Sequence, residues 1–355
     1  MMQLAWGDEV VLIDPLAPAM AEALTLLGPL LGGGGPVKVI HDVGFDARLL
    51  AEVGLTLGNV HDTALMAQWL ERTATGLASL AKAELGVTLD KSLQAADWAA
   101  RPLTESALHY LANDVVHLFA LDDKLFTEAQ QKEIVLELDE EIAYRLGSSE
   151  RAAREPDPRP AYVRMKGLDT VAPGDLKILR RLAEARSQEA ERLDAPEGEL
   201  VATAVLLAIA RARPTTLGAL GRIRSPIARK DSEGVGRALL EAVRLGVQDV
   251  DIPDDDRKWF NRPRIPPADI KARRDREARM SSWRKAEARA RGVSEQVVLP
   301  GHCVTELVAI APTTAADLST TAGLGAFRVA RYGEAILSAI HGPPDAPPAD
   351  TVLSS

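Results

Sequence analysis

The stretch VKVIHDVGFDARLL, residues 37–50, decides the fold class of this chain. Its first half is a short apolar run typical of a buried strand, and a helix is predicted over about residues 45–53. A second strand-like piece, GNVHD, ends at Asp62, which with Thr63 forms a typical start for the helix ALMAQWL. Strands that alternate with helices predict an α/β sheet with at least some parallel strands.

The flanking sequence divides the chain into regions of different character. Upstream, QLAW and VVLIDP surround the turn GDE and predict a hairpin. From about Gly76 the strand signals vanish and helical periodicity takes over. Charged, Pro-rich stretches at residues 148–162 and 252–269 indicate domain boundaries, and the Pro-rich tail HGPPDAPPADTVLSS is expected to be disordered.

Composition excludes several classes of protein. With 355 residues, 46% hydrophobic and 26% charged, the chain is long enough for two or three globular domains. It has no run of about 18 apolar residues that would span a membrane. The one cysteine, Cys303, excludes an internal disulfide framework and a Cys-based zinc site, and fits a reducing cytoplasm.

Charge is distributed unevenly. Residues 1–150 hold 23 Asp and Glu against 9 Lys and Arg, whereas the remaining residues hold 28 against 33. Residues 257–291 hold 13 basic residues against 4 acidic ones, with tryptophans among them. An anionic partner for the C-terminal half is therefore expected.

An internal repeat links the two C-terminal segments. ARARPTTLGAL at residues 210–220 and VAIAPTTAADL at residues 308–318 align without a gap at an offset of 98. In both, an apolar helix precedes the shared Pro-Thr-Thr and another helix follows it. The agreement predicts a duplicated helical module.

One helix-like run, ALHYLANDVVHL at residues 107–118, carries a candidate for chemistry. Tyr110 and Asp114 are four residues apart, so on a helix both emerge from one face. Such a pair occurs by chance in most helical proteins, so its spacing alone favours ordinary helix residues.

Taken together, HDVGFDARLL, HDTALMAQWL, LDKSLQ, DW, RPL and YLAND, in this order, resemble ribonuclease D and its 3′–5′ exonuclease relatives. The resemblance implies an α/β ribonuclease H-like exonuclease domain and a two-ion site for Mg²⁺ or Mn²⁺. Asp46 and Asp114 would ligate metal, and Tyr110, in the motif Tyr-x-x-x-Asp, would position the attacking water. Hard cations of this kind prefer carboxylate oxygens.

The resemblance continues downstream of this domain. YVRMKG at residues 162–167 is similar to the entry of the HRDC domain, a small all-α nucleic-acid-binding module. We therefore expect an exonuclease domain over residues 1–147, HRDC-type domains over 160–250 and 268–342, and a disordered tail over 343–355. The expected nucleic-acid contacts are Lys91, Arg101, Arg164, Lys166, Trp259, Arg273, Arg274 and Trp283.

The chain departs from the family pattern at its start. The family's first motif, Asp-x-Glu, lies on a central first strand that is missing from this chain, where MMQLAW already corresponds to the second strand. Half the usual metal carboxylates are therefore absent. Either Met1 is an internal methionine of a longer frame, with roughly 20–40 residues upstream, or the chain is a metal-poor pseudonuclease.

The leading expectation is thus a cytoplasmic 3′–5′ exoribonuclease that acts on single-stranded RNA 3′ ends, such as those of tRNA precursors. The alternative is a catalytically impaired nucleic-acid-binding protein, which the missing Asp-x-Glu motif favours. A DNA 3′–5′ exonuclease of the same fold is a further candidate.

Overall fold

The computed structural model describes residues 1–7, 9–18, 20–93, 96–155, 157–223, 231–260 and 266–342. The described residues form two compact units. One unit combines the N-terminal region, residues 1–155, with the second module, residues 266–342. The other is the first module, residues 157–260. The expected tail at residues 343–355 lies outside the described residues.

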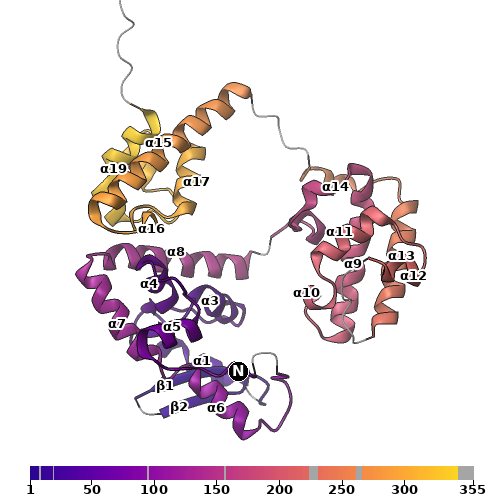
Figure 1. Cartoon of the computed structure of the whole chain (residues 1–355), viewed down its shortest axis with the longest axis horizontal. Helices are drawn as coiled ribbons and strands as arrows, with labels where there is room; N and C mark the ends of the chain where they lie inside the picture. The colour runs from indigo at the N-terminus through magenta and orange to yellow at the C-terminus, as the bar shows by residue number, and fades with distance from the viewer. Residues whose placement is uncertain are drawn as a thin grey trace, which may run out of the picture. The chain divides into compact units, whose positions relative to one another are not determined.

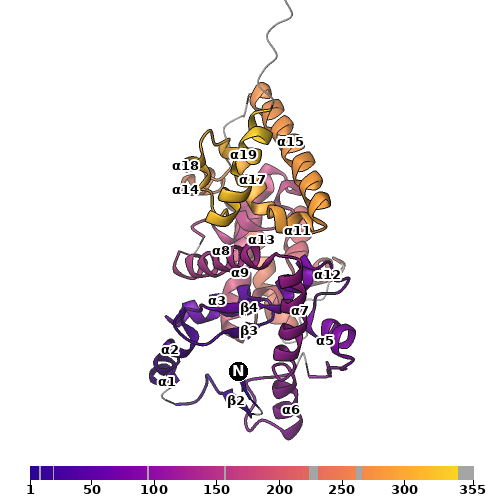
Figure 2. The same cartoon turned by 90° about the vertical axis from the view of Figure 1, so that its left-hand side faces the viewer.

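The strands of the N-terminal region form two small sheets (Figures 1 and 2). β1 (Met2–Trp6) and β2 (Glu9–Ile13) make the predicted antiparallel hairpin. β3 (Lys38–Ile40) and β4 (Val60–Asp62) pair in parallel, as the alternating pattern predicts. Within the described residues, β1 pairs only with β2 and β3 only with β4.

Helices make up the rest of the N-terminal region, and in its described part no strand follows β4, as predicted. Its apolar core gathers leucines of α4 and α7 with residues of α3, α5 and α8. The helices are α1 (Met20–Leu26), α2 (Gly28–Leu31), α3 (Val43–Glu52), α4 (Thr63–Trp69), α5 (Leu77–Leu85), α6 (Glu105–Asn113), α7 (Leu118–Gln131) and α8 (Val135–Arg154).

Two helix boundaries differ from those predicted. α3 begins at Val43 rather than near residue 45, because the Asp62 carboxylate accepts hydrogen bonds from the backbone N–H groups of Asp42 and Val43. The run at residues 107–118 is not one helix, since α6 ends at Asn113 and α7 starts at Leu118.

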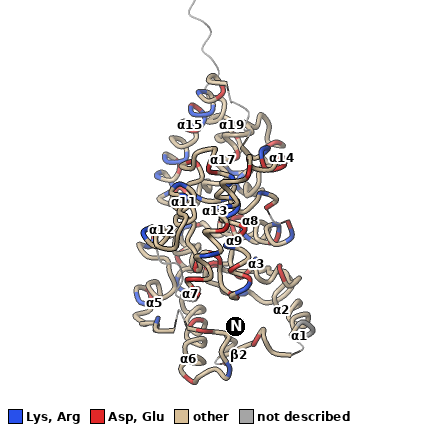
Figure 3. Tube along the Cα trace, turned by 90° about the vertical axis from the view of Figure 1, so that its right-hand side faces the viewer, with Lys and Arg blue, Asp and Glu red and all other residues tan. Residues whose placement is uncertain are grey.

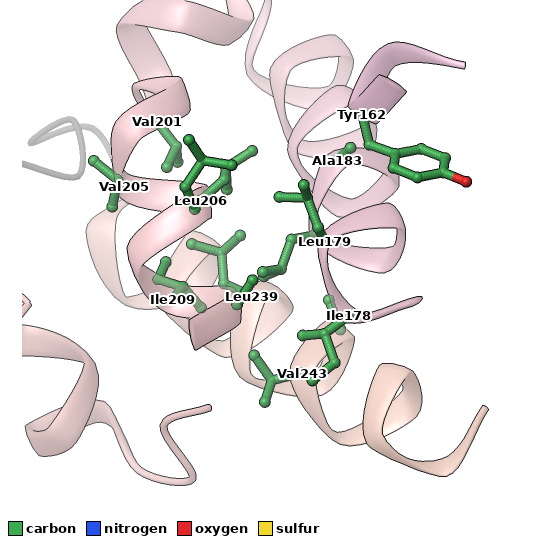
Figure 4. Packing of buried hydrophobic residues seen from close by; sticks show 14 of the residues in the cluster. Tyr162, Ile178, Leu179, Ala183, Val201, Val205, Leu206, Ile209, Leu239 and Val243 are labelled. Carbon is green, nitrogen blue, oxygen red and sulfur yellow. The ribbon is translucent and has the colours of Figure 1, made fainter. Parts of the chain in front are cut away.

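The first module is an all-α bundle built around α9 and α13 (Figure 4). Gly246 lets these helices approach closely, because a Cβ there would lie 2.6 Å from the Cα atom of Ile178. The elements are the 3₁₀ turns η1 (Ala161–Arg164), η2 (Leu168–Thr170) and η3 (Pro173–Asp175), and the helices α9 (Leu176–Leu193), α10 (Glu197–Leu200), α11 (Thr203–Ala212), α12 (Leu217–Gly221), α13 (Ser232–Gln248) and α14 (Asp254–Arg257).

The second module repeats this plan with a longer first helix. Its core includes Met280, Leu307 and Ile336, all fully buried. Its helices are α15 (Pro267–Arg291), α16 (Glu295–Val298), α17 (Gly301–Ile310), α18 (Ala315–Leu318) and α19 (Ala326–His341).

The predicted duplication is confirmed down to its helix caps. α10, α11 and α12 begin 98 residues before α16, α17 and α18, respectively. Thr216 and Thr314 both cap the helix that follows, each accepting a hydrogen bond from the third backbone N–H group. Arg213 and Ala311 both end the preceding helix in the left-handed conformation.

In the described part of the chain, no helix is both long and apolar enough to cross a bilayer.

Candidate active site

Asp46 lies in the first turn of α3, where it is half-buried. Burial, together with the negative charges of Asp42 and Asp62, raises the pKa of Asp46 from 3.8 to about 6. Such clustering of carboxylates at one sheet edge is costly without a counter-ion, and it is typical of functional sites.

Asp62, at the end of β4, is fully buried and holds the start of two helices. Its Oδ1 accepts hydrogen bonds from the N–H groups of Ala64 and Leu65, at 2.9 and 3.2 Å, which confirms the predicted cap of α4. Its carboxylate also accepts from Asp42 and Val43, at 3.0 and 3.2 Å. Since both its oxygens accept backbone hydrogen bonds, Asp62 is a structural carboxylate that orients α3.

Tyr110 and Asp114 lie at the end of α6, which Thr104 caps at its start and which packs against β1 and β2. The Tyr110 ring meets the ring of Trp98 with centroids 5.5 Å apart. Burial and the neighbouring Asp114 charge raise the pKa of Tyr110, and burial raises the pKa of Asp114. The pair therefore shares one partly desolvated surface, as its spacing predicts.

These two groups lie on different parts of the N-terminal region. α3 packs mainly against α8, whereas α6 packs against the hairpin. Among these residues, no group of three or more His, Cys, Asp or Glu side chains could hold a metal ion. The donor set described here thus does not complete a divalent-metal site by itself.

The predicted nucleic-acid contacts in the N-terminal region and the first module are mostly exposed. Lys91, Arg164 and Lys166 reach solvent. Arg101 instead forms a two-pronged pair with Asp14, at 2.6 and 2.7 Å. Trp259 is half-buried, with the Lys258 ammonium 5.2 Å from the centroid of its ring.

In the second module, the predicted contacts divide between its core and its surface. Trp283 is half-buried and packs edge-on against Tyr332, with centroids 5.9 Å apart. Arg273 and Arg274 are exposed on α15.

One face of α15 carries a row of exposed cations, which we call the basic stripe. Figure 3 shows Lys and Arg along this helix. At 3.6 residues per turn, the members of the stripe lie within about 60° of one another and span about 27 Å. None pairs with a carboxylate among the described residues. The stripe consists of Lys271, Arg274, Lys285 and Arg289.

A second set of functional candidates was missed by the sequence analysis. We call the contact between α8 and the second module the seam; Figures 1 and 2 show α8 beside this module. Three glutamates at i, i+3 and i+4 on α8 face basic side chains of the module. The only local signal for the seam is this spacing, which places all three on one helix face. The pairs are Glu137 with Arg291, Glu140 with Arg328 and Glu141 with His302.

Comparison with known families agrees with this division of the chain. Residues 1–130 match a 3′–5′ exonuclease family, and residues 175–243 and 273–340 each match the HRDC domain. The two HRDC matches fall on the two modules.

The chain also resembles individual proteins. It is 30% identical over 258 residues to ribonuclease D of Desulfotalea psychrophila, covering 71% of this chain and 67% of that one. It is 32% identical over 248 residues to ribonuclease D of Gluconacetobacter diazotrophicus, covering 68% and 61% of the two chains. The matched stretch thus spans about two thirds of each of these relatives.

Two solved structures share the fold. The crystal structure of Escherichia coli RNase D has a TM-score of 0.60 at 22% identity and covers 97% of this chain and 88% of that one. A protein from Bifidobacterium adolescentis has a TM-score of 0.62 at 22% identity, covering 86% and 79%.

Proposed function

The chain belongs to the ribonuclease D family, with a 3′–5′ exonuclease domain followed by two HRDC domains, and from this premise we propose that it is a 3′–5′ exoribonuclease. The observation that carries the proposal is that the exonuclease match contains Asp46, Tyr110 and Asp114. Its substrates would be single-stranded 3′ ends of cytoplasmic RNA, tRNA precursors among them.

In this proposal, Asp46 and Asp114 contribute to binding Mg²⁺ or Mn²⁺ in a two-ion site, and Tyr110 orients groups at the scissile phosphodiester. Oxygen donors suit these cations. These two carboxylates do not complete such a site by themselves in the described residues.

RNA would be held mainly by its phosphates. The basic stripe of α15 presents four cations that pair with no acid in the described part of the chain, so it supplies an attraction that does not depend on sequence. Exposed Lys91, Arg164, Lys166 and Arg273 would each offer a further phosphate contact, and Trp259 offers an aromatic ring beside a cation.

The test is a cleavage assay with the full-length chain. RNA labelled at its 5′ end should shorten stepwise from the 3′ end when Mg²⁺ or Mn²⁺ is present, and EDTA should stop the reaction. Asp114→Asn should lower the rate at least about 100-fold while leaving RNA affinity unchanged. Asp123→Asn, which alters an exposed acid on α7, is the matched control and should cleave like the parent.

A second candidate function is nucleic-acid binding without cleavage. It is favoured by the absence, among the described residues, of a group of three or more potential metal ligands. It predicts RNA affinity that falls steeply with salt and no shortening of labelled RNA. A parallel cleavage assay with DNA of the same sequence distinguishes both of these functions from that of a DNA exonuclease.

A further inference from the structure

We propose that the second module positions Asp46 through a chain of polar contacts that runs from His302 through Glu141 and Arg145 to Asp62. This polar chain crosses the seam and ends at the first turn of α3. The inference deepens the proposed function, because the catalytic importance of Asp46 rests on that function. The structural part of the inference, which is the control of α3 by the second module, does not rest on that function.

The polar chain starts in the second module. The His302 ring nitrogen Nε2 lies 2.9 Å from Oε2 of Glu141, a buried carboxylate on α8. The imidazole also stacks on the Tyr144 ring, with centroids 3.9 Å apart and planes 9° apart. A Cβ at Gly323 would lie 2.3 Å from the imidazole, so a residue without a side chain is needed there. The ring is therefore fixed by contacts on several sides.

The polar chain then passes along α8. Glu141 accepts a hydrogen bond from Nε of Arg145, one turn further on, at 2.9 Å. Nη1 of Arg145 lies 3.9 Å from Oδ2 of Asp62. Among the described residues, Arg145 is the cation that forms an ion pair with this fully buried carboxylate. This ion pair adds to the backbone hydrogen bonds that the buried carboxylate accepts from α3 and α4.

The polar chain ends at α3. Asp62 holds the N–H groups of Asp42 and Val43, one turn before Asp46. α8 makes a second contact with this turn, because the Ser149 hydroxyl donates to the carbonyl of Gly44 at 3.1 Å. The backbone that carries Asp46 is thus held from α8, and α8 is held from the second module.

The first module differs from the second at two of the positions that dock against α8. At the 98-residue offset, Ala204 replaces His302 and Leu193 replaces Arg291. The duplicated modules have therefore diverged at the positions that face α8. Reactive groups must be held within about 0.5 Å of their working positions, and a displacement of about 1 Å can cost 100-fold in rate.

The test compares His302→Gln with His341→Gln. His341 lies in the same module but bonds the carbonyl of Pro312, away from α8. We expect hydrogen exchange in the first turn of α3, measured on the metal-free full-length chain, to speed up at least 10-fold in His302→Gln only. Exchange in the middle of α7 should stay unchanged in both variants, which excludes global unfolding. For RNA cleavage, His302→Gln should lower kcat at least 10-fold with KM unchanged.

A second variant keeps the inference testable if His302→Gln undocks the module. Glu141→Gln preserves the size of the side chain but removes its charge, and it should speed exchange in the same turn of α3. Parent-like exchange in α3 for both variants would overturn the inference, as would fast exchange with an unchanged kcat. If the parent chain cleaves no RNA, the proposed function fails, while the exchange data still decide whether the module controls α3.

Discussion

The guanidinium of Arg328, at the start of α19, is completely buried against Glu140 of α8. Its Nη1 donates to Oε2 of Glu140 at 2.9 Å, and its Nη2 donates to the carbonyls of Glu137 and Val297, both at 3.1 Å. The group also lies 5.5 Å from the ring centroid of Trp69, in the core of the N-terminal region. One side chain of the second module therefore completes the packing of the exonuclease domain.

Replacing this cation should weaken the whole unit. We expect Arg328→Met to lower the free energy of unfolding by about 3–5 kcal/mol, because it removes the cation that pairs with a partly buried carboxylate and one hydrogen-bond donor to each of two carbonyls. Urea unfolding followed by tryptophan fluorescence measures the change. Arg331→Met, which alters an exposed arginine one turn away, should change it by less than about 0.5 kcal/mol. A similar effect of both substitutions would contradict the structural role of the seam.

One glycine position at the seam should not tolerate even the methyl side chain of alanine. A Cβ at Gly325 would lie 2.1 Å from the carboxyl carbon of Glu140, which is held by Arg328 and by the N–H of Phe327. Since the carboxylate cannot move without losing these bonds, Gly325→Ala should destabilise the unit by about 1–3 kcal/mol. Gly218→Ala in the first module adds a methyl group to open space and serves as the control in thermal unfolding.

The charge of Asp46 should reduce stability near neutral pH. Its pKa is raised to about 6 in the folded chain, so ionisation above that pH favours the unfolded state. In EDTA, Asp46→Asn should therefore raise the free energy of unfolding by up to about 3 kcal/mol above pH 6, and the gain should disappear below about pH 4. Urea unfolding at a series of pH values checks this. A gain in the free energy of unfolding that is independent of pH would show that ionisation of Asp46 does not destabilise the folded chain.

Local signals were enough to predict much of the fold. The hairpin, the parallel pair, the Asp62 cap and the duplicated modules all depend on patterns within a few residues, or on comparing one segment with another. Asp46, Tyr110 and Asp114 followed from the resemblance of short motifs in a fixed order, and their roles stay predictions.

The seam could not be predicted in this way. Glu140 and Arg328 are 188 residues apart, and the chain contains many other charged residues that remain exposed. A charge in a sequence does not indicate which partner it meets, or whether it is buried. The second role of Asp62 could not be predicted for the same reason. Its carboxylate accepts hydrogen bonds from a turn 20 residues earlier in the sequence, and tertiary packing sets the direction of that turn.

The basic stripe gives a prediction that separates phosphate contacts from general charge. If all four stripe cations contact phosphates, changing Lys271, Arg274, Lys285 and Arg289 to alanine should weaken RNA binding. It should also reduce the slope of log affinity against log salt by up to about 3, at about 0.7 per contact for single strands. Fluorescence anisotropy of a labelled single-stranded RNA at several salt concentrations measures both quantities.

The matched control removes the same charge from the first module. Its four arginines each pair with acids there, so they offer phosphates less free charge. Changing them to alanine should leave the salt slope within about 1 of the parent value. Equal slopes for the two fourfold variants would mean that RNA responds to net charge and that α15 is not its specific binding surface. The control set is Arg181, Arg192, Arg237 and Arg244.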